Sequence, residues 1–296
     1  MARHKAERSH RGAGIAAIAL GTMLWGTVGP IVELFPEGTA FQYASVRNVT
    51  GTIALWLLVL VSPRKRRYTR ADIAPIILGG LGVAGFFPLF SLGFARTGVA
   101  IAAVVSIGVA PIFAGLIAWA AFGHRPSPRW TLGTTIAVAG VVGLNWPSGD
   151  TRIDVLGVGL SLAAAFAYSW QATGMGMISQ RHTPFQAVAP IFTVGTLLQS
   201  PLVYGRSFEF LADPTLLAGA LYGGIATVAV AYALFTYGIR HVGTATAVTV
   251  GLTEPLTATI MGITLLGEVI TPVGIIGLAT ILLGLIVVSL PERSHP

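Results

Sequence analysis

The chain has 296 residues, of which 54% are hydrophobic and 10% are charged, and its mean hydropathy is +0.77. This balance excludes an ordinary soluble domain and predicts an integral membrane protein. The formal net charge of +7 suggests nucleic acid as a partner, but the positions of the basic residues along the chain explain it without one. Because the chain has no cysteine, disulfides, thiolate metal sites and cysteine nucleophiles are excluded.

The first eleven residues, MARHKAERSHR, are basic and precede a long apolar run, which is also the pattern of a cleaved signal peptide. The run from Gly12 to about Leu34 is too long for the hydrophobic region of a signal peptide and shows no clear small-residue cleavage site. We therefore interpret it as the first membrane span, retained in the protein.

Apolar runs of the length that crosses a bilayer, about 20 residues, recur along the chain with short polar breaks between them. Ten helices are predicted, at residues 12–34, 39–61, 72–94, 98–121, 128–146, 154–178, 185–204, 214–236, 241–266 and 271–290. No segment is left for a soluble domain. The predicted fold class is an all-α integral membrane protein with ten transmembrane helices.

Most basic residues fall on one side of this arrangement. If the N-terminus is inside, the inside segments hold Arg3, Lys5, Arg8, Arg11, Arg64, Lys65, Arg66, Arg67, Arg70, Arg125, Arg129, Arg181, Arg240 and Arg293. The outside loops hold only Arg96, Arg152 and Arg206. The positive-inside rule therefore predicts a multi-pass protein of the cell (inner) membrane with both termini in the cytoplasm.

The cluster SPRKRRYTR, from Ser62 to Arg70, is the densest group of basic residues. We interpret it as a topology anchor on the cytoplasmic side. The alternative is a binding surface for anionic lipid or another acidic partner.

The sequence contains two related halves. Five pairs match at an offset of 144 residues: Pro111 with Pro255, Gly123 with Gly267, Pro128 with Pro272, Gly133 with Gly277, and Gly140 with Gly284. Near the start of each half, Gly12, Gly14 and Trp25 match Gly157, Gly159 and Trp170 at an offset of 145. We therefore divide the chain into a cytoplasmic tail (1–11), a first repeat (12–146), a second repeat (147–290) and a second cytoplasmic tail (291–296).

Each repeat holds five spans, an odd number, so the first span and its counterpart cross the membrane in opposite directions. The two five-helix repeats are therefore predicted to be inverted. Inverted repeats are typical of secondary transporters, in which related halves open one central site alternately to either side.

The closing helices carry a glutamate before a proline, an apolar stretch, LLGE, a further proline and then GIIGLATILLGLIVV. Together with the degenerate first copy and the LWG of Leu24 to Gly26, this pattern resembles the EamA-type branch of the drug/metabolite transporter superfamily. Within that family the chain looks most like the YddG-type exporters of aromatic amino acids. The resemblance implies ten helices in two inverted repeats around a central cavity, and export of small metabolites.

The first copy departs from this pattern at two positions. It has Ala110 where the second copy has Glu254, and His124 where the second has Glu268. Any role of these acids therefore belongs to the second repeat alone.

Arg47 and Glu254 are the charged residues within the predicted interior spans, where a charge costs about 2.5–3.5 kcal/mol on insertion scales. At 1.5 Å per residue they lie roughly 12 Å and 18 Å below the outer edge, so their depths overlap. One interpretation is a buried ion pair that locks two helices. The other is a direct role in binding substrate or handling a proton.

Pro255 and its counterpart Pro111 are hinge candidates, because a proline inside a helix frees a carbonyl and bends the helix. Broken helices commonly build transporter sites. The alternative is a tolerated kink solvated by neighbouring helices.

Aromatic and polar residues supply the remaining site candidates. The aromatic ones are Trp25, Tyr43, Phe87, Phe90, Tyr168, Trp170, Tyr232 and Tyr237, and the polar ones include Thr253 and Gln171. Trp25 and Trp170 match between the repeats and lie well within their spans, so the pair is a candidate for the central axis. Interface belts, packing and hydrogen bonds between helices are the alternatives.

An enzyme is not predicted, because the six histidines lie in tails or at loop edges and no Walker motif, zinc signature or nucleophile elbow occurs. No cofactor or metal is expected. A channel is the second class, but the halves offer few polar residues to line a wet pore.

The predicted function is a secondary transporter for a small molecule, with membrane lipids as surroundings and protons left open as a coupling ion. Phosphorylated substrates are disfavoured because Arg47 is the only cation within a span. A neutral or zwitterionic amphipathic solute fits better. The resemblance narrows this to amino acids, particularly aromatic ones, with drugs or other metabolites as the alternative.

Overall fold

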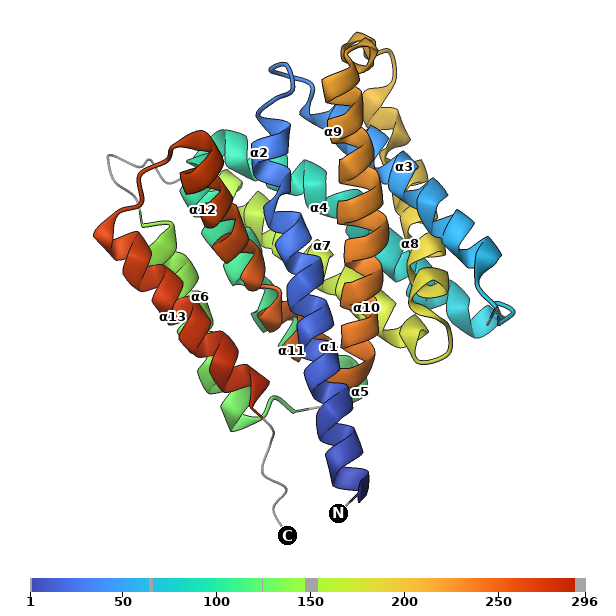
Figure 1. Ribbon diagram of the computed structural model, residues 1–296, viewed down its shortest axis with the longest axis vertical. Helices are drawn as coiled ribbons and strands as arrows, with labels where there is room; N and C mark the ends of the chain where they lie inside the picture. Colours follow the sequence, from blue (N-terminus) through green and yellow to red (C-terminus); the bar gives the residue numbers. More distant parts are fainter. Residues whose placement is uncertain (1, 64–65, 124, 147–153, 291–296) are drawn as a thin grey trace.

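The computed structural model describes residues 2–63, 66–123, 125–146 and 154–290, apart from the side chains of residues 2–8 and 99. Every regular element in these ranges is a helix, and the helices form one bundle (Figure 1). In chain order they are α1 (Ala2–Gly26), α2 (Val28–Val32), α3 (Ala40–Val61), α4 (Arg70–Ala103), η1 (Val104–Gly108), α5 (Ala110–Phe122), α6 (Pro128–Leu144), α7 (Val155–Ser179), α8 (Pro184–Gln199), η2 (Ser200–Val203), η3 (Glu209–Ala212), α9 (Pro214–Gly224), η4 (Ile225–Val230), α10 (Ala231–Val242), α11 (Thr244–Val250), α12 (Thr253–Leu266) and α13 (Pro272–Ser289).

Nine helical stretches among the described residues are long and apolar enough to cross a membrane. They correspond to nine of the predicted spans. The remaining predicted span, 128–146, forms α6, which has 17 residues and packs along α13. That length is at the lower end of what a spanning helix needs, about 17–25 residues. The protein is therefore an all-α membrane protein.

The outward surface has the character that a bilayer requires. Leu60, Ile276 and Ile286 are more than half exposed, with relative accessibilities of 64%, 65% and 58%. Such side chains would be costly on a surface facing water, but they cost nothing against lipid tails. The buried positions instead include many small residues and threonines, which allow close helix contacts and hydrogen bonds between helices.

The helix boundaries differ from the prediction at several places, including the predicted break at 237–240, which lies inside α10 (Ala231–Val242). Helix α1 begins at Ala2, so the predicted N-terminal tail continues the first span as helix. Helix α4 continues through the predicted break at 95–97, and only Gly98, with φ of 78°, interrupts its helical conformation. The predicted single span 241–266 is divided, because α11 ends at Val250 and α12 begins at Thr253.

The two halves repeat their backbone conformations as well as their residues. Gly123 and Gly267 end α5 and α12 in the left-handed conformation, with φ of 68° and 70°. A left-handed residue at this position is usually glycine, because a Cβ would clash. The next helix of each half then begins at the same kind of cap: the Ser127 and Thr271 hydroxyls accept bonds from the backbone N–H three residues later.

The helices α6 and α13 pack against each other through the glycines that match between the halves. A Cβ at Gly140 would lie 2.7 Å from the Gly277 carbonyl, and one at Gly284 would lie 2.6 Å from the Gly133 carbonyl. Only glycine permits this approach. The contact is also reciprocal: the first glycine of each helix meets the second glycine of the other, which is the pattern of a twofold axis.

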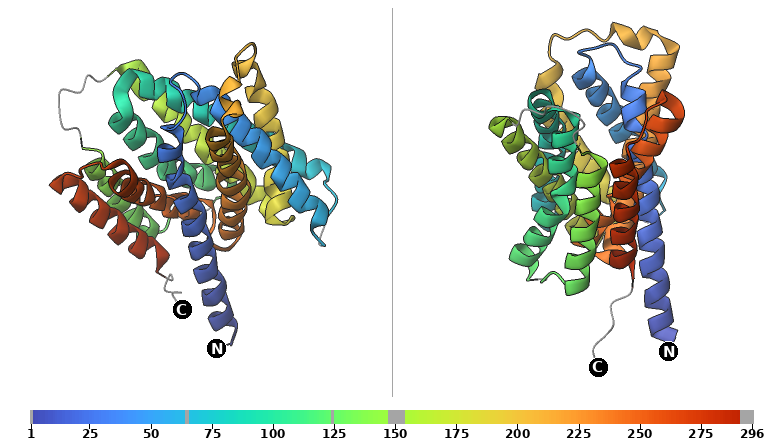
Figure 2. Two further views of the ribbon diagram at one scale, coloured as in Figure 1. Left: turned by 45° about the horizontal axis from the view of Figure 1, so that its top comes forward. Right: turned by 90° about the vertical axis from the view of Figure 1, so that its left-hand side faces the viewer.

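The start of α1 and the end of α13 lie at the same end of the bundle (Figures 1 and 2). This is the arrangement that the predicted spans require. The residues Arg64, Lys65, His124, Arg152 and the predicted tail 291–296 lie outside the described ranges.

Candidate functional site

Arg47 extends from α3 into the bundle and is half-buried. Its Nε donates a hydrogen bond to the Thr227 hydroxyl at 2.8 Å, and its Nη2 donates a longer one to the Thr227 carbonyl at 3.4 Å. The indole Nε1 of Trp25, on α1, donates to the same carbonyl at 2.9 Å. We call this group of Trp25, Arg47 and Thr227 the Thr227 node. It joins three helices that are far apart in the sequence.

The Thr227 carbonyl is available to these side chains because η4 is a π-helix. In an α-helix the N–H of residue 231 would bond to the carbonyl of residue 227. Here the Ala231 N–H bonds to the Ala226 carbonyl, one residue earlier. Short π-helical segments of this kind occur frequently at functional sites.

An aromatic cluster surrounds the node. The Trp25 ring lies 4.5 Å from Tyr232, 5.1 Å from Phe235 and 6.1 Å from Tyr168, measured between ring centroids. Tyr168 also approaches Phe86 at 5.8 Å. Aromatic pairs at these separations stabilise their packing and offer flat apolar surface beside the charged groups.

Glu254 lies in the first turn of α12, directly after the break at 251–252. Gly26 of α1 packs against this turn so closely that a Cβ there would lie 2.7 Å from the Glu254 carbonyl. The Tyr168 hydroxyl approaches the break as well, 3.4 Å from the position of a Cβ at Gly251. The glutamate is thus placed against α1 and near Tyr168.

The structure does not bring Arg47 and Glu254 into direct contact. The ion pairs within 4.0 Å that the structure shows among its described residues do not include these two. The two charges nevertheless interact electrostatically, and Glu254 also interacts with Tyr168 and Tyr232. Within the described part of the chain, no group donates a hydrogen bond to the Glu254 carboxylate. The two opposite charges therefore interact across the interior without forming an ion pair within 4.0 Å.

The two hinge candidates lie where helices begin instead of in mid-helix. Pro111 is in the first turn of α5, after the π-helix η1, and Pro255 is in the first turn of α12. A proline is tolerated there because the first N–H groups of a helix have no partner within it. The carbonyl freed by Pro255, that of Gly251, accepts the Glu254 N–H at 2.9 Å. The chain is thus broken at matching places in the two halves.

Other sequence candidates lie beside the node. Tyr43 is buried, and its hydroxyl would lie 2.6 Å from a Cβ at Gly223, one turn before Thr227. Gln171 is buried and packs against α4 at Gly82. Thr253 is buried too, but its hydroxyl donates to the Val250 carbonyl at 2.7 Å.

Trp170 does not join Trp25. Its ring packs on Phe166 of the same helix at 5.4 Å, and Phe166 in turn contacts Phe113 of α5. Phe166 is 41% exposed, whereas the Trp170 indole Nε1 is buried without a hydrogen-bond partner in the described part of the chain. The match between the two tryptophans in sequence therefore does not place both of them at one site.

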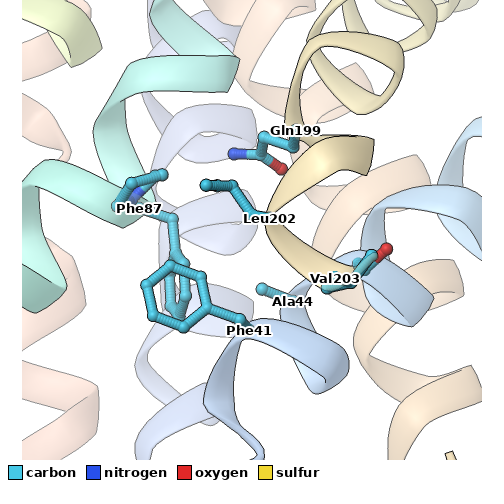
Figure 3. A pocket seen from close by; sticks show the side chains of 8 residues that line it. Phe41, Ala44, Phe87, Gln199, Leu202 and Val203 are labelled. Atoms are coloured by element: carbon cyan, nitrogen blue, oxygen red, sulfur yellow. The ribbon is translucent and has the colours of Figure 1, made fainter. Parts of the chain in front are cut away.

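Phe87 lines a small pocket (Figure 3). The pocket is bounded by Phe41, Ala44, Ser45, Phe87, Pro88, Gln199, Leu202 and Val203. Figure 3 shows the rings of Phe41 and Phe87 side by side, with Gln199 nearby. Pro88 has no N–H for the Ala84 carbonyl, and Gln199 Nε2 donates to that carbonyl at 3.2 Å instead. Phe90 packs on Phe86 and so reaches the aromatic cluster indirectly.

A second polar group lies at the end of the bundle where α4 and α8 begin. Asp72 accepts bonds from the Thr69 N–H at 2.8 Å and from His182 Nε2 at 3.1 Å, and it forms an ion pair with Arg181 at 3.3 Å. Tyr68 stacks on His182 at 4.9 Å. We call Tyr68, Thr69, Asp72, Arg181 and His182 the Asp72 cluster. It joins the two halves of the chain.

Tyr68 donates a hydrogen bond to the Gln186 carbonyl at 2.9 Å. Burial, together with the nearby negative charge of Asp72, raises the pKa of Tyr68 to about 12. The hydroxyl therefore stays protonated and remains a donor over the whole physiological pH range.

Sequence reasoning missed Thr227, Phe235 and the Asp72 cluster. Thr227 resembles the many other threonines of the spans, and a π-helix has no reliable sequence signal. For the Asp72 cluster a signal existed: Thr69 and Asp72 have the spacing of a capping box, and both of its side-chain bonds are present.

The fold and these polar groups define an all-α membrane protein built from two related halves, with charged residues inside the bundle. The chain belongs to the EamA-like transporter family, whose model matches residues 12–146 and 155–290.

The relatives that match over most of the chain include the following three. The uncharacterized transporter YwfM of Bacillus subtilis is 32% identical over 94% of each chain. The probable terminal-alkyne amino-acid exporter of Streptantibioticus cattleyicolor is 22% identical over 92% of each chain. The threonine/homoserine exporter RhtA of Escherichia coli is 26% identical over 84% of this chain and 82% of its own.

One crystal structure superposes with a TM-score of 0.77 and covers 94% of this chain and 96% of its own. Its sequence is 18% identical, so the comparison shows likeness of fold alone.

Proposed function

We propose that this protein is a secondary transporter that exports small amphipathic metabolites, chiefly amino acids, by alternating access. The observation that carries the proposal is the pair of opposite charges, Arg47 and Glu254, which interact within the bundle without direct contact. Two relatives are named as amino-acid exporters, which supports the same substrate class.

An amino acid has the charges that such a site needs. Arg47 presents donors for a carboxylate, and Glu254 presents acceptors for an ammonium group. Trp25, Tyr168 and Tyr232 supply flat apolar surface between the two charges for the side chain of the substrate. This surface supports the narrower proposal that aromatic amino acids are preferred.

The proposed architecture is ten transmembrane helices in two inverted five-helix repeats, related by a pseudo-twofold axis in the membrane plane. The reciprocal glycine contact of α6 and α13 supports it, because an axis of this kind makes the two matching helices run antiparallel. Matching breaks before Pro111 and Pro255 give each half a place to bend.

Both termini are proposed to lie in the cytoplasm of the inner membrane, and labelling of single cysteines tests this. The chain has no native cysteine to remove. Arg66 and Tyr204 are both exposed, at connections that the proposal places on opposite sides of the membrane. An impermeant maleimide should label Tyr204→Cys in intact cells and Arg66→Cys only after permeabilisation. Labelling of Arg66→Cys in intact cells would contradict the proposed orientation and indicate the opposite one.

Transport by the purified protein in vesicles tests the function. We expect saturable uptake of phenylalanine or threonine, accelerated by unlabelled amino acid on the opposite side, since counterflow is the property of a carrier. Flux that does not saturate would indicate a channel-like facilitator. Saturable uptake of hydrophobic drugs with none of either amino acid would contradict the proposed substrate class.

The same vesicles test two finer points. Competition among phenylalanine, tyrosine and tryptophan supports the aromatic preference, and a lack of competition contradicts it. Accumulation driven by an imposed pH gradient would show proton coupling, whereas equilibration without accumulation would show facilitated diffusion.

A further inference from the structure

Thr227 is placed to control the direction of the Arg47 side chain. The threonine is fully buried, with a relative accessibility of 0%. Its hydroxyl accepts from Arg47 Nε at 2.8 Å and donates to the Gly223 carbonyl, so both functions of the hydroxyl are used and its orientation is determined. An arginine held in this way loses less freedom when it binds a ligand.

The π-helix adds a second attachment point. The Ala231 N–H bonds to the Ala226 carbonyl instead of the Thr227 carbonyl. The Thr227 carbonyl therefore accepts hydrogen bonds from Arg47 Nη2 and the Trp25 indole. A regular α-helix at η4 would occupy that carbonyl with its own backbone. The local irregularity of the helix therefore serves the arginine and the tryptophan together.

These contacts use one edge of the guanidinium and leave another available. Thr227 accepts from Nε and Nη2, and none of the described residues accepts a hydrogen bond from Nη1. The pair of Nη1 and Nη2 forms a planar fork that matches a carboxylate. Thr227 thus holds the guanidinium of Arg47 by its Nε–Nη2 edge. The Nη1–Nη2 edge remains available for a ligand.

We propose that Thr227 is a positioning residue, which aims Arg47 at the carboxylate of the substrate and thereby sets the preference for amino acids over amines. The inference rests on the proposed function, since it takes an amino acid as the substrate. The Thr227 carbonyl also accepts a hydrogen bond from Trp25. Thr227 therefore orients both the arginine and the tryptophan of the proposed site.

The test compares Thr227→Val, which keeps the shape of the side chain but removes its hydroxyl, with Thr227→Ser, which keeps the hydroxyl. The matched control is Thr236→Val, because Thr236 lies on α10, is also 0% exposed, and has a hydroxyl without a hydrogen-bond partner in the described part of the chain. Each protein is assayed in vesicles with phenylalanine or threonine, whichever the wild type carries. The competitor is the corresponding amine, phenethylamine or 1-amino-2-propanol, which lacks the carboxylate.

We expect Thr227→Val to raise the KM for the amino acid about tenfold, the effect of losing one hydrogen bond to a charged group, while the inhibition constant of the amine stays the same. Thr227→Ser should restore the KM, and Thr236→Val should match the wild type. A KM unchanged in Thr227→Val, or equal weakening of amino acid and amine, would overturn the inference while leaving the proposed function intact. A wild type that transports neither amino acid would instead contradict the proposed function itself.

Discussion

Glu254→Gln should leave the protein folded and reduce amino-acid transport at least about tenfold. The amide nearly preserves the shape of the side chain. Among the described residues, the Glu254 carboxylate forms no ion pair within 4.0 Å and accepts no hydrogen bond. The substitution should therefore remove no contact that holds the fold together. What it removes is the negative charge that we assign to the ammonium group of the substrate. Vesicle transport and thermal stability in detergent measure the two effects separately.

Arg47→Gln should behave differently, because Arg47 has structural partners and Glu254 has none of comparable strength. The substitution removes both bonds to Thr227, and we expect it to destabilise the protein by about 1.5–3 kcal/mol as well as to lower transport. The double variant should then show a coupling in stability no larger than the low end of the range for groups in contact, about 0.5 kcal/mol, because the two charges interact electrostatically without direct contact. Its transport should not recover.

The double-mutant cycle distinguishes a functional pair from a structural one. Strong coupling in stability, with transport restored in the double variant, would show that Arg47 and Glu254 form the locking ion pair that the sequence left open. The control is Glu209→Gln, an exposed glutamate outside the bundle, which should change neither property. Normal transport and stability in Glu254→Gln would assign the glutamate no role.

The fold was largely predictable because the membrane leaves few choices. Long apolar runs must form helices there, since every backbone polar group needs an internal partner. The matching glycines and prolines located the repeats, and the structure shows why they match: Gly123 and Gly267 both adopt the left-handed conformation, and Gly140 and Gly277 touch. The backbone conformation or a close helix contact requires glycine at these positions. A requirement of this kind is visible directly in the sequence.

The site was predictable only in part, because depth along a helix does not determine what a side chain faces. Counting residues placed Arg47 and Glu254 at overlapping depths, yet it could not show that Thr227 holds the arginine. The match of Trp25 with Trp170 shows the same limit: Trp25 lies in the central cluster, whereas Trp170 packs on Phe166 of its own helix. Which face a helix turns inward depends on its neighbours.

The Asp72 cluster should contribute more to stability than any other charged group in the described part of the chain. The Asp72 side chain is 1% exposed and interacts at once with Thr69, His182 and Arg181. His182 is 2% exposed, so the charge of the carboxylate strengthens a hydrogen bond between buried groups. Hydrogen bonds to a charged group typically contribute about 1.5–3 kcal/mol.

Asp72→Asn tests this, because the amide keeps the size of the side chain and removes only its charge and one acceptor. We expect a fall in the melting temperature in detergent, corresponding to about 1.5–3 kcal/mol. The matched control is Asp154→Asn. Asp154 also lies at a helix N-terminus and pairs with an arginine, Arg96, at 3.6 Å, but its side chain is 39% exposed. Exposed pairs contribute about 0–1 kcal/mol, and asparagine remains a good N-cap, so the control should melt close to the wild type. Equal melting of the two variants would show that burial adds nothing to the Asp72 cluster, and that the two halves are held together at this end by helix packing alone.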